Sequence, residues 1–161
     1  MSIAYRDDLE KFLTDKANEV FEGQVIKVDV WERVPYTGFL GIDFTVRPYW
    51  AKYWWEAGKG EITFMFPSQE VMEKVPRKPL LAVLAHELGH AEQRLVIRRG
   101  RLLPPPIESD AWRRGIKSAS RLDVMGYYIS LFFELLPANP MEDLRRVMTQ
   151  FEELRQALGG G

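Results

Sequence analysis

Residues 86–90 read His-Glu-Leu-Gly-His and contain the only two histidines of this 161-residue chain. On a helix, side chains four positions apart lie on one face about one turn apart, so both imidazoles can reach the same metal ion while the glutamate lies beside it. A catalytic zinc takes such nitrogen ligands, a third protein ligand and a water molecule, whose proton a nearby glutamate accepts. The motif therefore predicts one Zn²⁺ ion held by His86 and His90, with Glu87 as general base.

The residues around the motif favour a buried helix. An apolar stripe at helical spacing passes through the motif, and it consists of Leu80, Leu84, Leu88, Ala91 and Leu95. Pro79 in the first turn and Gly100 just past the end are typical of helix ends, so we expect a helix over 79–99. The alternative is that both histidines are ordinary helix residues whose side chains are partly buried and hydrogen-bonded.

The third ligand must be a carboxylate, because the chain has no cysteine and no further histidine. Glu108 and Asp110 are the candidates, in a stretch that reads Ile-Glu-Ser-Asp-Ala-Trp over 107–112. The alternative for Glu108 is a solvated carboxylate that the helix dipole favours at a helix start.

Together, 86–90 and 107–112 resemble the gluzincin group of zinc peptidases, and the resemblance covers about residues 61–122. In that group a Glu on the next helix completes a two-His, one-Glu site, and an Ala commonly follows three residues later. Glu108 with Ala111 matches this spacing, whereas Asp110 does not. The resemblance implies zinc ligation by His86, His90 and Glu108.

The same resemblance implies a zincin-like fold and a zinc-dependent metallopeptidase that hydrolyses peptide bonds in a peptide or protein substrate. In related peptidases an edge strand before the metal helix binds extended peptide, so we expect this of residues 61–66, with a buried central strand as the alternative. The aromatic side chains of Trp50, Tyr53, Trp54 and Trp55 could form a wall for the substrate or close a core.

The chain departs from the group at Trp112, where many gluzincins have an Asp that accepts a hydrogen bond from a ligand imidazole. An indole only donates, so the acceptor must be a backbone carbonyl or another carboxylate, such as Asp110 or Asp123.

A donor for the oxyanion that forms during hydrolysis is also needed. Tyr127 and Tyr128 would lie about 28 Å from Glu108 along an unbroken helix, and only a break near Gly126 would bring them back. Arg101, Arg113 and Arg114 are closer in sequence, but solvated surface positions are the favoured interpretation for them.

The remaining pattern predicts one α+β domain over 1–161, with a core of about 24–136. We expect an N-terminal helix over 3–21 and three antiparallel strands, at 24–34, 39–47 and 61–66, with a turn at 35–38 and an aromatic connection at 49–55. Ser68 would cap a short helix, a bent or broken helix would follow over 108–136, and a last helix would run over 140–158.

Composition sets the remaining expectations. The net charge of −1 gives no general attraction to nucleic acid or anionic lipid, and no apolar run approaches the length of a membrane span, so a cytoplasmic protein is the default. Eight basic residues lie in 94–121, at Arg94, Arg98, Arg99, Arg101, Arg113, Arg114, Lys117 and Arg121. Two alternatives to an enzyme follow: a regulatory module that binds protein or nucleic acid through this segment, or a structural zinc site with a closed fourth position.

Overall fold

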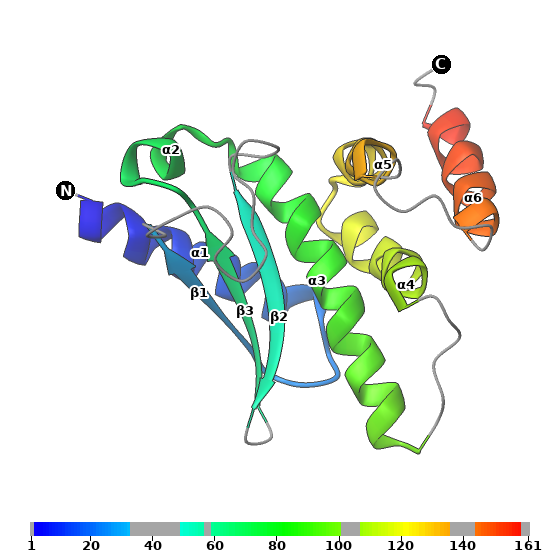
Figure 1. The fold of residues 1–161 in the computed structure, drawn as a ribbon, viewed down its shortest axis with the longest axis horizontal. Coiled ribbons are helices and arrows are strands. Elements are labelled where there is room, and N and C mark those ends of the chain that lie inside the picture. Colours follow the sequence, from blue (N-terminus) through cyan, green and yellow to red (C-terminus); the bar gives the residue numbers. More distant parts are fainter. Residues whose placement is uncertain (1, 33–48, 57–58, 101–106, 136–143, 159–161) are drawn as a thin grey trace. The chain divides into compact units, whose positions relative to one another are not determined.

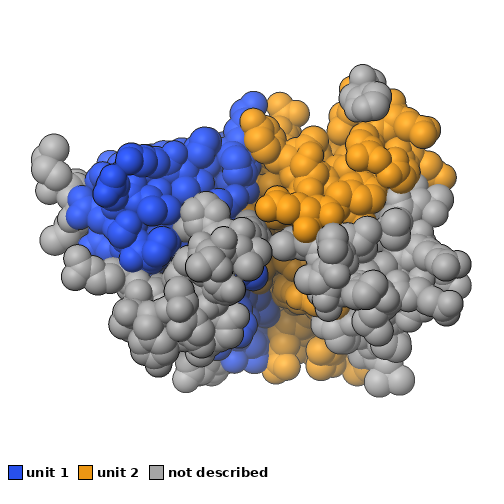
Figure 2. Space-filling view, turned by 45° about the horizontal axis from the view of Figure 1, so that its top comes forward, with its two compact units in different colours: residues 1–80 blue, residues 81–161 orange. Residues whose placement is uncertain are grey.

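The computed structural model describes residues 2–32, 49–56, 59–100, 107–135 and 144–158, which form six helices and a three-stranded mixed sheet (Figure 1). The chain divides into two compact units, residues 1–80 and 81–161, coloured blue and orange in Figure 2. None of the described helices is both long and apolar enough to cross a membrane. The α+β class is confirmed, and the single domain stays a prediction.

The first unit contains the sheet. Its strands are β1 (Ile26–Trp31), β2 (Trp50–Glu56) and β3 (Lys59–Met65), in the order β1-β3-β2. β1 runs parallel to β3, with Ile26 opposite Gly60, whereas β2 pairs with β3 in the antiparallel direction.

Three strand predictions were wrong. The strand within 24–34 pairs in parallel, because alternation records which face a side chain occupies and not the direction of its partner. Residues 61–65 belong to the central strand of the described sheet, which was the alternative to an edge strand, and Phe66 follows the strand. The stretch 49–55, predicted as a connection, contains most of β2. The predicted strand at 39–47 and turn at 35–38 lie outside the described residues.

Helix α1 (Ser2–Val20) confirms the predicted N-terminal helix. Its apolar positions at three- and four-residue spacing are buried, namely Leu9, Leu13, Ala17 and Val20. The helix lies beside β1 in the first unit (Figure 1).

Polar side chains of α1 bind the backbone of β1. Asn18 exchanges two hydrogen bonds with Ile26 (2.7 and 2.9 Å), Thr14 exchanges two with Val28 (3.3 and 3.1 Å), and the Val30 N–H donates to Glu10 Oε1 (2.9 Å). The spacing of these side chains along α1 matches the spacing of their partners along β1, because four residues of a helix rise about 6 Å and two residues of a strand rise about 6.6 Å. Side chains at 10, 14 and 18 thus satisfy alternate residues of the strand.

This arrangement predicts the effect of Thr14→Val, which keeps the side-chain shape and removes its hydroxyl. The Val28 N–H loses its partner, so we expect the free energy of unfolding to fall by about 1–3 kcal/mol in urea denaturation. Asp8→Ala, at an exposed position of the same helix, should change it by less than about 0.5 kcal/mol. Equal stability of Thr14→Val and the wild type would show that these bonds contribute nothing.

Two further helices lead to the motif. In α2 (Gln69–Lys74) the Val71 N–H donates to Ser68 Oγ at 3.2 Å, which confirms Ser68 as the cap. Helix α3 (Arg77–Arg98) confirms the predicted motif helix and begins two residues earlier than expected. The division between the two units falls within α3.

The second unit continues with α4 (Ile107–Arg121), α5 (Met125–Leu135) and α6 (Leu144–Ala157). The predicted break comes before Gly126, between α4 and α5, where Asp123 adopts a positive φ of 59° and the Val124 N–H donates to the Ala119 carbonyl at 3.0 Å. A left-handed residue at a helix end, closed by such a bond, is a usual way for a helix to stop. The start of the predicted helix at 140–158 lies outside the described residues.

Candidate metal centre

His86, His90 and Glu108 come together in the second unit. The Oε2 atom of Glu108 lies 3.4 Å from Nε2 of His86 and 2.9 Å from Nε2 of His90. One ligand atom from each residue can be chosen so that all three lie within 4.8 Å of one another. The two candidate histidines and the favoured carboxylate therefore form a group that could bind a metal ion.

The group is buried on the histidine side and open at the carboxylate. His86 is buried, and the side chains of His90 and Glu108 are 20% and 55% exposed. Within the described part of the chain, the group has three members. Three protein ligands with one side accessible leave room for a water molecule or a substrate.

The charges of the group support one another in the metal-free protein. Burial opposes protonation of His90, but its hydrogen bond with Glu108 and the charges of Glu87 and Glu108 outweigh this effect and raise its pKa to about 9. Burial likewise opposes ionisation of Glu108, yet hydrogen bonds from both histidines keep its pKa far below the ordinary value. A metal ion that binds through Nε2 of His90 would have to displace a proton from that atom.

Two glycines let the helices that carry this group approach closely. A Cβ at Gly89, inside the motif, would lie 2.2 Å from the carbonyl oxygen of Ala111 on α4. A Cβ at Gly115 would lie 2.6 Å from the carbonyl oxygen of Ala85 on α3 and 2.2 Å from the Tyr128 hydroxyl. Any larger residue at either position forces α3 and α4 apart.

Gly89→Ala is therefore expected to lower stability and to weaken metal binding together. The added methyl group meets backbone, which cannot rotate away, so we expect a loss of about 1–3 kcal/mol or more. Gly126→Ala is the matched control, because its Cβ would meet nothing within 4 Å and alanine is the better helix former. Chemical denaturation and zinc titration of both variants test this, and a Gly89→Ala protein as stable as Gly126→Ala would contradict it.

Trp112 packs against His86, a candidate metal ligand. Its ring lies 4.1 Å from the His86 ring, centroid to centroid, with 31° between the planes. Trp112 also contacts Tyr128, Phe132 and Phe151, at centroid distances of 5.1, 5.5 and 6.5 Å. The indole thus connects a metal-ligand candidate to the buried aromatic cluster of the second unit.

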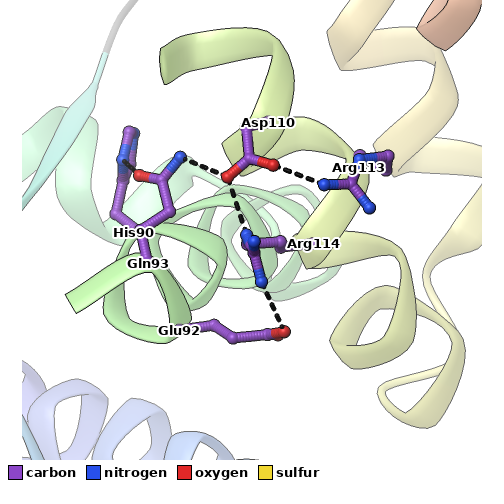
Figure 3. Close-up of polar contacts among 6 residues, drawn as sticks. All are labelled: His90, Glu92, Gln93, Asp110, Arg113 and Arg114. Carbon is purple, nitrogen blue, oxygen red and sulfur yellow. Dashed lines mark hydrogen bonds and ion pairs between the residues drawn. The ribbon is translucent and has the colours of Figure 1, made fainter. Parts of the chain in front are cut away.

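The acceptor for His90 is an amide that the sequence did not suggest. Oε1 of Gln93 lies 2.8 Å from Nδ1 of His90, and Nε2 of Gln93 donates to Oδ2 of Asp110 at 2.9 Å (Figure 3). Asp110 was a candidate for this acceptor and for the third ligand. In the structure it accepts from Gln93, which in turn contacts His90. Gln93 comes three positions after His90 on the same helix, which is the spacing that could have identified it.

Two arginines hold Asp110. Arg113 donates to Oδ1 at 2.5 Å, and Arg114 donates to Oδ2 at 2.7 Å and to Oε1 of Glu92 on α3 at 3.1 Å (Figure 3). Burial opposes ionisation of Asp110, but the hydrogen bonds from Gln93 and both arginines outweigh it and lower its pKa. Asp110 is therefore a carboxylate at neutral pH.

The candidates for an oxyanion donor differ in their exposure and in their partners. Tyr128 is fully buried, and its hydroxyl donates to the Trp112 carbonyl at 2.6 Å, so it is not free to bind a substrate. Tyr127 is 49% exposed. Arg113 and Arg114 bind Asp110, and Arg101 lies outside the described residues.

The aromatic residues proposed as a substrate wall belong to the first unit. Trp54 and Trp55 line a hollow of about 470 Å³ together with Trp31. Its remaining walls are polar and come from Asp29, Lys59, Glu61 and Thr63.

Comparison of the chain with protein-family models, curated proteins and solved structures gave no match.

Proposed function

We propose that this protein is a zinc-dependent hydrolase that cleaves peptide bonds. The observation that carries the proposal is the convergence of Nε2 of His86 and Nε2 of His90 on Oε2 of Glu108, at 3.4 and 2.9 Å. Two imidazoles and one carboxylate are a ligand set that suits Zn²⁺ in catalytic sites. Peptide-bond cleavage, within the hydrolases, rests on the gluzincin resemblance of residues 86–90 and 107–112.

The donor set fits zinc chemically. His86 and His90 would bind through Nε2 and Glu108 through a carboxylate oxygen. Zinc held in this way acts as a Lewis acid and lowers the pKa of water. The chain's own contribution is to fix the three ligands and to place a base beside them.

Glu87 is the candidate base. It follows His86 directly, it is 6% exposed, and its charge acts on both His90 and Tyr128. A carboxylate so close to the ligands can accept a proton from water as the water attacks a carbonyl, and then return the proton to the leaving amine.

The geometry favours this proposal over the two alternatives. A structural zinc site needs a fourth protein ligand, and the described residues supply three around a half-open carboxylate. In the basic segment, Arg113 and Arg114 pair with Asp110, and Arg114 also pairs with Glu92, which reduces the positive charge that these two residues offer to nucleic acid.

Zinc content tests the ligand set. We expect the wild type to bind about one zinc ion per chain and Glu108→Ala to lose more affinity than the roughly 10- to 100-fold typical of an outer-shell change. Elemental mass spectrometry after dialysis measures this, with Glu153→Ala on the exposed side of α6 as control. Equal zinc in the wild type and Glu108→Ala would remove Glu108 from the site.

Activity tests the base. Glu87→Gln keeps the size of the side chain and cannot accept the proton, so kcat on a quenched fluorescent peptide library should fall by about 10²- to 10⁴-fold while zinc stays bound. Glu153→Gln serves as the matched control. Undiminished hydrolysis by Glu87→Gln with a full zinc complement would reject this role.

A further inference from the structure

Gln93 links His90 to Asp110 by two hydrogen bonds, and the chemistry of the three side chains fixes which group donates in each bond. Asp110 accepts hydrogen bonds from Arg113 on Oδ1 and from Arg114 on Oδ2, and because a guanidinium only donates, both of its oxygens act as acceptors. The Gln93 atom that faces Asp110 must therefore be the donor, Nε2, at 2.9 Å. This orientation turns the acceptor Oε1 of Gln93 towards Nδ1 of His90, at 2.8 Å.

The orientation of Gln93 also determines the state of Nε2 of His90, the candidate metal-binding atom. Because Oε1 of Gln93 can only accept, Nδ1 of His90 must carry its proton. A metal ion that displaces the second ring proton would then bind the lone pair of Nε2, the atom that lies 2.9 Å from Glu108. His90 is thereby held in the tautomer and ring orientation that a metal ligand at Nε2 requires.

We infer that Gln93 and Asp110 are positioning residues for the metal centre, which set the tautomer and orientation of His90 through an amide relay from Arg113 and Arg114. The inference rests on the proposed function, since it concerns the same site. Gln93 acts through His90, and Asp110 acts through Gln93.

Burial makes the relay rigid. Gln93 and Asp110 are 4% and 3% exposed, so water does not compete for their hydrogen bonds. Arg114 also reaches Glu92, which ties α4 to the part of α3 that carries Gln93. Turning the amide would place its oxygen against the Asp110 oxygen, two acceptors with no proton between them, which buried groups do not tolerate.

His86 provides an internal comparison. Among the described residues, its Nδ1 is buried without a hydrogen-bond partner, and its ring lies against Trp112 instead. A change at Gln93 should therefore alter the His90 ring and leave that of His86 largely unchanged. The two rings can be followed separately, because the chain has no other histidine.

The test uses Gln93→Met, which keeps the length of the side chain and removes the acceptor. We expect its affinity for Zn²⁺, measured by competition with a chromophoric chelator, to fall by about 10- to 100-fold. Gln156→Met on the exposed face of α6 is the matched control and should bind zinc as the wild type does. Zinc binding by Gln93→Met that is as tight as wild type would overturn the inference and leave the proposed function standing.

A double-mutant cycle separates positioning from general support of the fold. Asp110→Asn should weaken zinc binding in the wild-type background and should have little further effect in Gln93→Met, since Asp110 acts through Gln93. Equal, additive losses in both backgrounds would show that Asp110 acts independently, and would overturn the relay.

A measurement on the wild type alone covers the case in which a variant does not fold. In ¹⁵N-detected spectra of the zinc-loaded protein, the His90 ring should carry a slowly exchanging proton on Nδ1. An Nδ1 proton of His90 that exchanges with water as fast as that of an exposed imidazole would overturn the inference. Absence of any zinc binding by the wild type would instead reject the proposed function, and the inference with it.

Discussion

The backbones of α3 and α4 touch at Gly89 and Gly115, and the arrangement of the second unit depends on this contact. Each glycine leaves a space that the carbonyl oxygen of the other helix occupies. Because a metal group needs its ligand atoms within a few ångströms of one another, a carboxylate on α4 can join two imidazoles on α3 only where the helices run this close. Gly89, inside the 86–90 motif, thus has a packing role that is independent of the proposed chemistry of its neighbours.

The two histidines that share this site are held by different forces. His86 lies against an indole that belongs to the aromatic cluster, and dispersion and burial hold its ring. His90 is held by a directed polar chain that ends at two arginines. Packing limits where a ring can lie, whereas a hydrogen bond also decides which nitrogen carries the proton, so the two ligands are constrained to different degrees.

The sequence predicted the centre of the site better than its surroundings, for physical reasons. His86 and His90 are close because helix geometry alone places them so, and Glu108 followed from a family spacing. Gln93 was not predicted because only carboxylates and backbone carbonyls were expected as partners of the imidazole, although the oxygen of a side-chain amide also accepts. Strand β2 was missed because its aromatic residues, at Trp50 and 53–55, occupy both faces and hide the alternation that reveals a strand. The parallel pairing of β1 depends on a partner distant in sequence, which local alternation does not encode.

The bonds from α1 to β1 have a consequence for how the protein meets other chains. Strand edges with unpaired N–H and C=O groups are templates on which a second copy, or any extended segment, can assemble. On β1 the N–H groups of Ile26, Val28 and Val30 and the carbonyl groups of Ile26 and Val28 are already bound by side chains of α1. A helix cannot be extended sideways as a strand can, so these groups of β1 do not offer a pairing edge to another strand as long as α1 stays folded against them. Helix α1, with its nineteen residues, thus protects this strand from aggregation and also forms part of the core.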